Sequence, residues 1–250
     1  MTDLLTTLEN HQLWLDGDPA GVRADFTDAD LTGAVLVDVD LRWATFTRTD
    51  LTGADLSGAD LSGADLRSAT LSGVLAVGTF LSVADPTWVD ADGNQPFPAV
   101  HNVLLSGVDL TSVALTGANL AGADLTDAIL TGADLIGANL PGADLTFADL
   151  TGADLTDTKM ERADLTDADL TDAVLRGADL SQANLNRTNM TRANMRGAKA
   201  QHVKTPGVNL TDSDLTDSDL SDSDLEGADL TGADLTRADL SRAKNHRRDV

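Results

Sequence analysis

The sequence predicts an all-β solenoid, a narrow coiled tube in which each turn of the chain stacks on the next. Three observations lead to this fold class. An apolar pair recurs every five residues over most of the 250 residues, Tyr is absent, and only 3% of residues are aromatic. A period of five matches neither the helical period of about 3.6 nor the strand period of about 2. So few large side chains suit stacked repeats better than a layered core.

The repeat occupies two blocks, each in a single phase. Leu, or Met in a few units, is the usual centre of 28 units from Leu105 to Leu240, and 12 more units run from Phe26 to Leu81. Ala usually precedes the centre by two residues, so this apolar pair should point inward while the polar residues between face water. Stacked turns then pair backbone with backbone at about 4.8 Å. The aromatic centres Phe26 and Phe46 are 20 residues apart, which predicts four units per coil if they stack.

Units such as Ala-Asp-Leu-Thr-Gly and Ala-Asn-Leu-Ala-Gly resemble the signature A(D/N)LXX of the pentapeptide-repeat family. The resemblance covers about 200 of the 250 residues. It implies a right-handed, quadrilateral β-helix with four units on each coil. The 40 units would then form about ten coils, with a length of roughly 48 Å at the ordinary inter-strand spacing.

A short helix is expected before the first repeat. Apolar residues in 2–15 fall at helical spacing, and Gly17 with the following residues ends the helix. Solenoid ends need covers, which favours a capping role over the alternative of a partner-binding helix. The expected segments are the capping helix and linker (1–22), coils 1–3 (23–81), an inserted wall loop (82–103), coils 4–10 (104–241) and a basic C-terminal tail (242–250).

The insertion at residues 82–103 breaks the phase, because the flanking centres lie one unit plus 19 residues apart. Trp88 and Phe97 in this loop are expected to fold back over the wall. There they would cover apolar residues that replace the usual Asp, namely Leu75, Phe80 and Leu104. A recognition loop on a rigid scaffold is the second interpretation, and both can hold together.

Charge is high and unevenly placed. The formal net charge is −24, but Asp directly precedes the centre in 22 of the 40 units, so much of the acidity belongs to the repeat itself. Residues 159–204, called the basic band below, hold eight bases and six acids, whereas 105–158 hold eight acids and no base. Residues 211–239 are again acidic, with ten acids and one base.

Two charge patterns follow from 20 residues per coil. Asp124, Asp144 and Asp164, called the acidic stack below, should lie like on like. A second column should alternate in sign, through Lys159, Asp179, Lys199 and Asp219. Around residues 199–206 the centres become Ala200 and Thr205, and the loss of Leu predicts a local bulge or thin wall there.

The sequence contains no arrangement that is typical of an enzyme. Its four His residues fall in different segments, Cys is absent, and no phosphate loop, nucleophile–base pair or metal-ligand spacing is found. The run from Asp90 to Asn94 fits a hairpin turn better than an EF-hand loop, whose twelfth ligand would be His101. We therefore expect no catalysis and no cofactor. Without an apolar span or a signal peptide, a cytoplasmic protein with no membrane contact is the default expectation.

Two functional interpretations follow. The first is a non-catalytic structural or protein-interaction scaffold, which the repeat-derived acidity favours. The second is a DNA mimic, because a rod of carboxylates resembles duplex DNA in charge and width. The resemblance to the family members MfpA and Qnr, acidic dimers that engage DNA gyrase, implies binding to gyrase or another type II topoisomerase, with inhibition or quinolone protection. This chain is only distantly like them, and no C-terminal capping and dimerising helix like theirs is expected.

A protein partner is expected in either case, and the acidic wall is not expected to bind nucleic acid directly. The last coil should lack a helical cover, so its end should fray, be closed by the basic tail or meet another copy. An end-to-end homodimer is the natural closed solution. The candidate partner-binding residues are Asp124, Asp144, Asp164, Asp212, Asp217, Asp222, Asp224, Asp229, Trp88 and Phe97.

Overall fold

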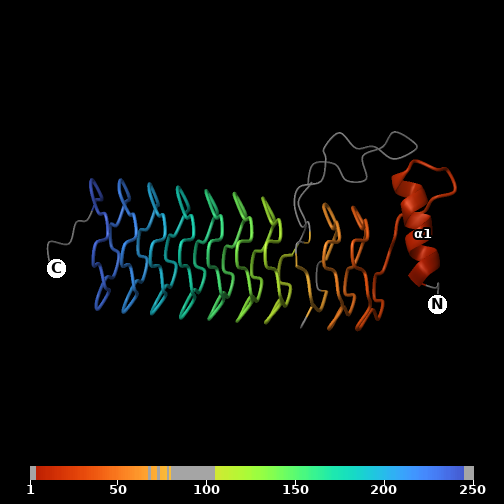
Figure 1. Cartoon of the computed structure of the whole chain (residues 1–250), viewed down its shortest axis with the longest axis horizontal. Coiled ribbons are helices and arrows are strands. Elements are labelled where there is room, and N and C mark those ends of the chain that lie inside the picture. Colours follow the sequence, from red (N-terminus) through yellow and green to blue (C-terminus); the bar gives the residue numbers. More distant parts are fainter. Residues whose placement is uncertain (1–3, 67–68, 72–73, 78, 80–104, 245–250) are drawn as a thin grey trace.

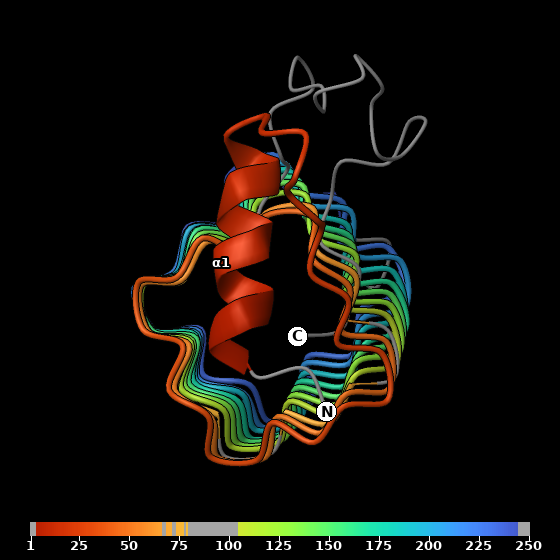
Figure 2. The same cartoon turned by 90° about the vertical axis from the view of Figure 1, so that its right-hand side faces the viewer.

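The computed structural model describes residues 4–66, 69–71, 74–77, 79 and 105–244. It consists of one helix, α1 (Leu4–Leu15), and a straight rod of stacked coils (Figure 1). Seen along its axis, the rod has four sides, and the outline of each coil repeats that of the one before (Figure 2). The sequence prediction of a four-sided solenoid is confirmed.

Backbone pairing fixes the register of the coils. Each side contributes a single bridging residue per coil, and the bridges are parallel between residues 20 apart, as in Asp124 with Asp144. Leu125 N donates to Asp144 O at 2.7 Å, and Asp144 N donates to Ala123 O at 3.0 Å. This spacing of 20 residues confirms four units per coil. The rings of Phe26 and Phe46 stack with centroids 5.0 Å apart, as that coil length requires.

The corners are tight turns formed by the two residues after each centre. At one such corner, Val108 N donates to Leu105 O at 3.1 Å. The second corner residue has a positive φ, as in a type II turn, which is why Gly is frequent there. Non-glycine residues also adopt this left-handed conformation, including Asp127 (φ 57°) and Phe147 (φ 61°). Since a bulky side chain rarely adopts it, Phe147 is strained.

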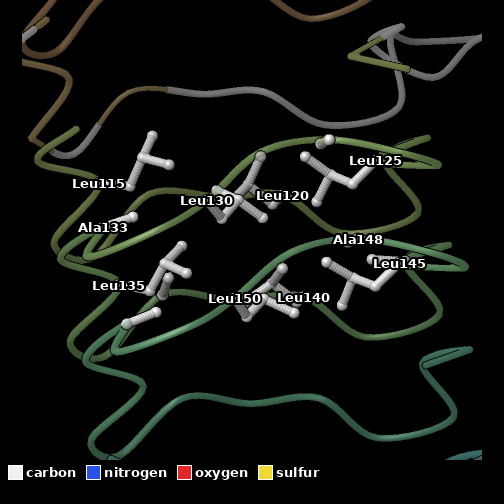
Figure 3. Close-up of a cluster of buried hydrophobic side chains, with 14 of the residues drawn as sticks. Leu115, Leu120, Leu125, Leu130, Ala133, Leu135, Leu140, Leu145, Ala148 and Leu150 are labelled. Carbon is white, nitrogen blue, oxygen red and sulfur yellow. The ribbon is translucent and has the colours of Figure 1, made fainter. Parts of the chain in front are cut away.

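The core is a column of Leu with Ala beside it. Figure 3 shows Leu135 under Leu115 and Leu145 under Leu125, so identical side chains pack on one another from coil to coil. These residues are fully buried. Where Thr or Ser replaces Ala, the hydroxyl donates to a backbone carbonyl, as Thr188 does to Leu165 O at 2.8 Å. The hydroxyl that replaces an inward Ala is thus satisfied within the tube.

The coils continue in register across the insertion. Thr70 bridges Asp109, and Leu75 bridges Ala114, so these partners are 39 residues apart, one coil of 20 plus 19 more. Trp88 and Phe97, with the predicted covering of Phe80 and Leu104 and the run from Asp90 to Asn94, lie outside the described residues. Leu75, the remaining residue of the predicted contact, is 49% exposed.

Helix α1 lies across the N-terminal end of the rod (Figure 2). Leu4 and Leu8 pack against the core column. His11 is fully buried, and its Nδ1 accepts a hydrogen bond from Ala24 N at 3.1 Å. Gly21 lies so close to the helix that a Cβ there would overlap the backbone of Trp14. The helix therefore covers the open end of the first coil.

The bulge or thin wall predicted near Ala200 and Thr205 is confirmed only as a local change of one corner: the Ser223 hydroxyl accepts a hydrogen bond from Val203 N at 3.2 Å and donates to Ala200 O at 2.8 Å. Ala200 N donates to Asp219 O at 2.7 Å and Thr205 N to Asp224 O at 3.0 Å, so the ladder is unbroken. The Thr205 hydroxyl also donates to Asp224 O. The backbone ladder thus continues past the smaller centres, while the corner after Ala200 is closed through the Ser223 side chain.

Candidate interaction surface

The aspartates of the wall have a structural task. In each of many units, the Oδ1 atom of the Asp before the centre accepts a hydrogen bond from the backbone N–H two residues later. The distance is 3.1 Å from Thr126 to Asp124 and 3.0 Å from Thr146 to Asp144. Where the corner residue is Thr, its hydroxyl often donates to the same oxygen, at 2.5 Å from Thr146 to Asp144. Asp thus caps the corner that follows it.

At several of these positions the hydrogen bonds lower the pKa of the capping carboxylate. The hydroxyl and backbone N–H of Thr27 hold the pKa of Asp25 below its ordinary value, and Thr32 does the same for Asp30. At the other end of the rod, Thr236 lowers the pKa of Asp234 in the same way. One oxygen of each carboxylate therefore caps a turn, while the charge of the group remains on the wall.

Asparagine caps the corner equally well. The Oδ1 atoms of Asn184 and Asn209 accept the corresponding backbone N–H at 3.2 and 3.0 Å. The fold therefore needs an oxygen acceptor at this position but not a negative charge. Fold and charge can be separated by an Asp-to-Asn substitution.

The structure brings together the acidic stack. Asp124 bridges Asp144, which bridges Asp164, on one side of the rod. The negative charge of this column ends there, because the next two residues are the neutral Asn184 and the positively charged Lys204. Asp224 follows Lys204 in the same column, separated from the stack by these two coils.

The remaining predicted aspartates do not gather on one surface. Asp212, Asp217 and Asp222 occupy three successive corners, each with a positive φ. Asp229 lies on another side, bridged to Asn209. Consecutive units point in different directions, so proximity in sequence does not give a shared face. The two aromatic candidates, Trp88 and Phe97, lie outside the described residues.

Ion pairs neutralise part of the predicted acidic cluster. Arg237 binds both oxygens of Asp217, at 2.5 and 2.6 Å, and Arg242 binds Asp222 at 2.6 Å. These pairs belong to a series in which Arg and Asp occupy the same corner on adjacent coils. The other members are Arg48 with Asp28, Arg187 with Asp167 and Arg192 with Asp172. Their 20-residue spacing was the sequence signal that could have revealed them.

The predicted alternating column is present. Lys159 bridges Asp179, which bridges Lys199, and Lys199 bridges Asp219. Lys199 Nζ lies 3.7 Å from Asp179 Oδ2. Exposed pairs of this kind contribute about 0.2–1 kcal/mol each to the free energy of unfolding. This column therefore adds little to the stability of the fold.

An exposed apolar strip lies on one side of the N-terminal half, and the sequence analysis noted only one of its residues. Val35 and Leu75 share a column, both bridged to the intervening Asp55, and are 73% and 49% exposed. The other members of the strip are Val37, Val77 and Ile136, also exposed. The sequence signal was the replacement of Asp or Thr by aliphatic residues.

Among the described residues, no group of His, Cys, Asp and Glu is placed to hold a metal ion. The same part of the chain has no helix long and apolar enough to cross a membrane. The walls of the rod carry many exposed or partly exposed charged side chains. Such walls bind partners by charge and shape.

These features define a pentapeptide-repeat solenoid. The chain belongs to the pentapeptide-repeat family: the model described as "Pentapeptide repeats" matches residues 24–63, 104–140, 128–167, 168–204 and 207–244. Similar solved structures are right-handed quadrilateral β-helices. Proteins of this family are generally structural or interaction proteins and not enzymes. No curated protein matches the sequence.

Two solved structures are similar over most of their length. HetL, a pentapeptide-repeat protein involved in the regulation of heterocyst differentiation in the cyanobacterium Nostoc sp. strain PCC 7120, is 32% identical, with a TM-score of 0.54. That match covers 88% of this chain and 89% of HetL. QnrB1, a plasmid-mediated fluoroquinolone resistance protein, is 17% identical with a TM-score of 0.51 and 89% coverage of each chain. At that identity, the likeness to QnrB1 concerns the fold alone.

Proposed function

We propose that this protein is a non-catalytic scaffold that binds a protein partner along a charged wall of the rod. The observation that carries the proposal is that one oxygen of a wall carboxylate caps a turn while the other oxygen stays available. In Asp144, Oδ1 accepts the backbone N–H of Thr146 at 3.0 Å, which leaves Oδ2 and the negative charge for a partner. The rigid ladder then holds successive charges at a fixed spacing of about 4.8 Å.

The acidic stack is the part of the wall best suited to this role. Asp124, Asp144 and Asp164 lie on one side with no base between them. Like charges in adjacent positions destabilise a sheet, so a basic partner would gain affinity by relieving their repulsion. The corner aspartates offer less, because Arg237 and Arg242 already bind Asp217 and Asp222.

A capture experiment with two matched variants tests this proposal. One variant carries Asp124→Asn, Asp144→Asn and Asp164→Asn, and the control carries Asp109→Asn, Asp149→Asn and Asp169→Asn on another side. Both lose three charges and keep their capping oxygens. With bacterial extract as the source of partners, wild type and control should retain the same proteins, and the first variant should lose them. Equal capture by all three proteins would contradict the role of the acidic stack.

The alternative function is that of a DNA mimic that binds DNA gyrase or another type II topoisomerase. The acidic stack favours it, since regularly spaced carboxylates on a rod imitate phosphates and would enter a basic cleft. The fold is shared with QnrB1, a fluoroquinolone resistance protein. DNA supercoiling by purified gyrase is the direct test, with inhibition or drug protection as the positive result.

We also propose that two copies meet through their C-terminal coils. In the described part of the chain, the last coil has no layer over it, and Leu240 is 36% exposed whereas Leu220, one coil earlier, is buried. A second copy would cover these residues and pair the open backbone edge. Analytical ultracentrifugation should give twice 26.0 kDa, and Leu240→Lys should give a monomer. A dimer that Val35→Lys dissociates and Leu240→Lys does not would place the interface on the apolar strip instead.

A further inference from the structure

One corner of the rod presents an exposed aromatic side chain where most corners have Gly or a polar residue. Phe147 is 57% exposed and has a φ of 61°. Trp43 is the other described Phe or Trp with a positive φ, and its ring is buried against Leu15 of helix α1. In the described part of the chain, Phe147 belongs to no buried cluster. Packing therefore explains the aromatic residue at position 43 but not the one at position 147.

A second exposed apolar residue lies next to this corner. Ile129 is 41% exposed and bridges Asp149, which follows Phe147 by two residues at the start of the next side. Ile129 takes the place of an aspartate in its column, because its other bridging partner is Asp109. Phe147 and Ile129 thus give the corner an apolar surface. We call these two residues the Phe147 corner.

The middle carboxylate of the acidic stack lies at the other end of the same turn. Ala148 N donates to Leu145 O at 3.0 Å and closes the turn between Asp144 and Phe147. Oδ1 of Asp144 accepts the backbone N–H and the hydroxyl of Thr146. Among the described residues, no hydrogen bond engages its Oδ2, and Asp144 is exposed. One carboxylate oxygen is therefore available beside the aromatic ring.

The first bases along the two adjoining corner columns have other partners. Arg187, on the column of Phe147, is held by Asp167. Arg162, in the basic band, donates from Nε to Gln182 Oε1 at 3.1 Å. No described ion pair within 4.0 Å engages any of the three carboxylates of the acidic stack. The surface beside the Phe147 corner therefore keeps negative charge that a basic partner can match.

We propose that the Phe147 corner is the docking point for an arginine in a basic segment of a partner protein, an inference that rests on the proposed scaffold function. A guanidinium stacks on an aromatic face and also matches carboxylate oxygens. One arginine can therefore cover the Phe147 ring and bind Oδ2 of Asp144, while its aliphatic stem packs on Ile129. Asp124 and Asp164, about 4.8 Å away along the rod on either side, then bind neighbouring bases of the same segment.

This role also explains why a bulky residue occupies a strained position. Backbone strain that packing does not repay is characteristic of functional residues. Replacing such a residue should raise stability and lower binding. Phe147→Asn is therefore an informative variant, because weaker binding by a more stable protein does not come from unfolding.

Two peptides of equal charge test the proposal, one with arginines alternating with glycines and one with lysines in place of the arginines. Calorimetry at low salt should show tighter binding of the arginine peptide by wild type. Phe147→Asn should weaken the arginine peptide about two- to fivefold, as the loss of an exposed cation–π contact does, and change the lysine peptide less. Phe147→Trp should bind at least as tightly as wild type. Ile136→Asn, the control, removes an apolar residue that is 38% exposed on another side and should change nothing.

The variant carrying Asp124→Asn, Asp144→Asn and Asp164→Asn separates this inference from the function on which it rests. If that variant loses the arginine peptide while Phe147→Asn binds it as wild type does, the Phe147 corner is not the docking point and the acidic wall remains the binding surface. If the variant binds the peptide as wild type does, the acidic stack has no part in binding and both proposals are wrong. Equal binding of the two peptides by wild type, or unchanged binding by Phe147→Leu, would overturn the assignment of an arginine to the ring.

Discussion

The side-chain amide of Asn184 donates to Oδ1 of Asp164 at 3.1 Å, directly below the acidic stack. The same amide donates to the hydroxyl of Thr166 at 2.9 Å. Asn184 therefore continues the column of caps while ending the column of charges. This pair shows within the native chain what an Asp-to-Asn substitution does to a wall: the hydrogen bond that caps the corner is kept, and the negative charge is removed.

Asp144→Asn should leave the fold intact and raise the free energy of unfolding by a few tenths of a kcal/mol. Asn keeps the cap on Thr146, and the substitution removes two like-charge contacts, which cost about this much when exposed. Thermal unfolding at low and high salt measures the effect, which should shrink as salt screens the charges. Asp144→Ala, the control, loses the cap and should destabilise by about 1 kcal/mol. If the two variants unfold alike, the cap has no role.

Gly21→Ala should strongly destabilise the N-terminal cover. A Cβ at this position would overlap the backbone of Trp14, and backbone cannot move aside as a flexible side chain can. We expect a loss of about 2 kcal/mol or more. Gly17→Ala is the control, because Gly17 has a φ of 77° but open space around its Cβ position. That change should cost only about 1 kcal/mol. Urea unfolding followed by tryptophan fluorescence compares them, and equal losses would exclude the predicted overlap.

Acid should weaken the cover through His11. Burial lowers the pKa of His11 from 6.5 to about 4, so the unfolded chain binds a proton between these values and the folded chain does not. The contribution of neutral His11 to the free energy of unfolding is therefore complete above pH 6.5. It is lost as the pH falls to 4, and the loss is about 3 kcal/mol in total.

The measurement is the free energy of unfolding in steps between pH 7 and pH 4. Wild type should lose stability across this window, whereas His11→Gln, which cannot titrate, should show a much flatter profile. A slope of equal size in both proteins would assign the effect to groups other than His11.

Phe147→Asn should stabilise the rod by roughly 0.5–1 kcal/mol. Phe147 has a φ of 61° and is 57% exposed, so it bears strain and gives little packing in return. Asn tolerates the left-handed region better than a bulky side chain does. Asp127→Asn, one coil earlier on the same corner with a φ of 57°, is the control and should be neutral. A lower melting temperature for Phe147→Asn would show that the Phe147 ring makes a stabilising contact.

The fold could be predicted from the sequence because each five-residue unit forms one side of a coil. The 20-residue stacking of Phe26 on Phe46 could be read directly from the phase of the centres. The acidic stack followed from the same arithmetic. The grouping of Asp212, Asp217 and Asp222 failed because consecutive corners face different directions, so neighbours in sequence diverge in space.

Other features needed the structure because they depend on geometry that the repeat pattern does not encode. The strain at Phe147 comes from a positive φ that its corner imposes. At Ala200 the departure from the repeat is limited to one corner, where the Ser223 hydroxyl bridges Val203 N and Ala200 O.

The central claim is the proposal that the rod is a protein-interaction scaffold and not a DNA mimic. The most direct measurement is DNA supercoiling by purified gyrase, titrated with the protein at two salt concentrations beside the variant carrying Asp124→Asn, Asp144→Asn and Asp164→Asn. The account predicts that neither protein changes supercoiling at micromolar concentration. Inhibition or drug protection by wild type that weakens with salt and is absent in the variant would contradict it, and would establish the acidic stack as a DNA mimic.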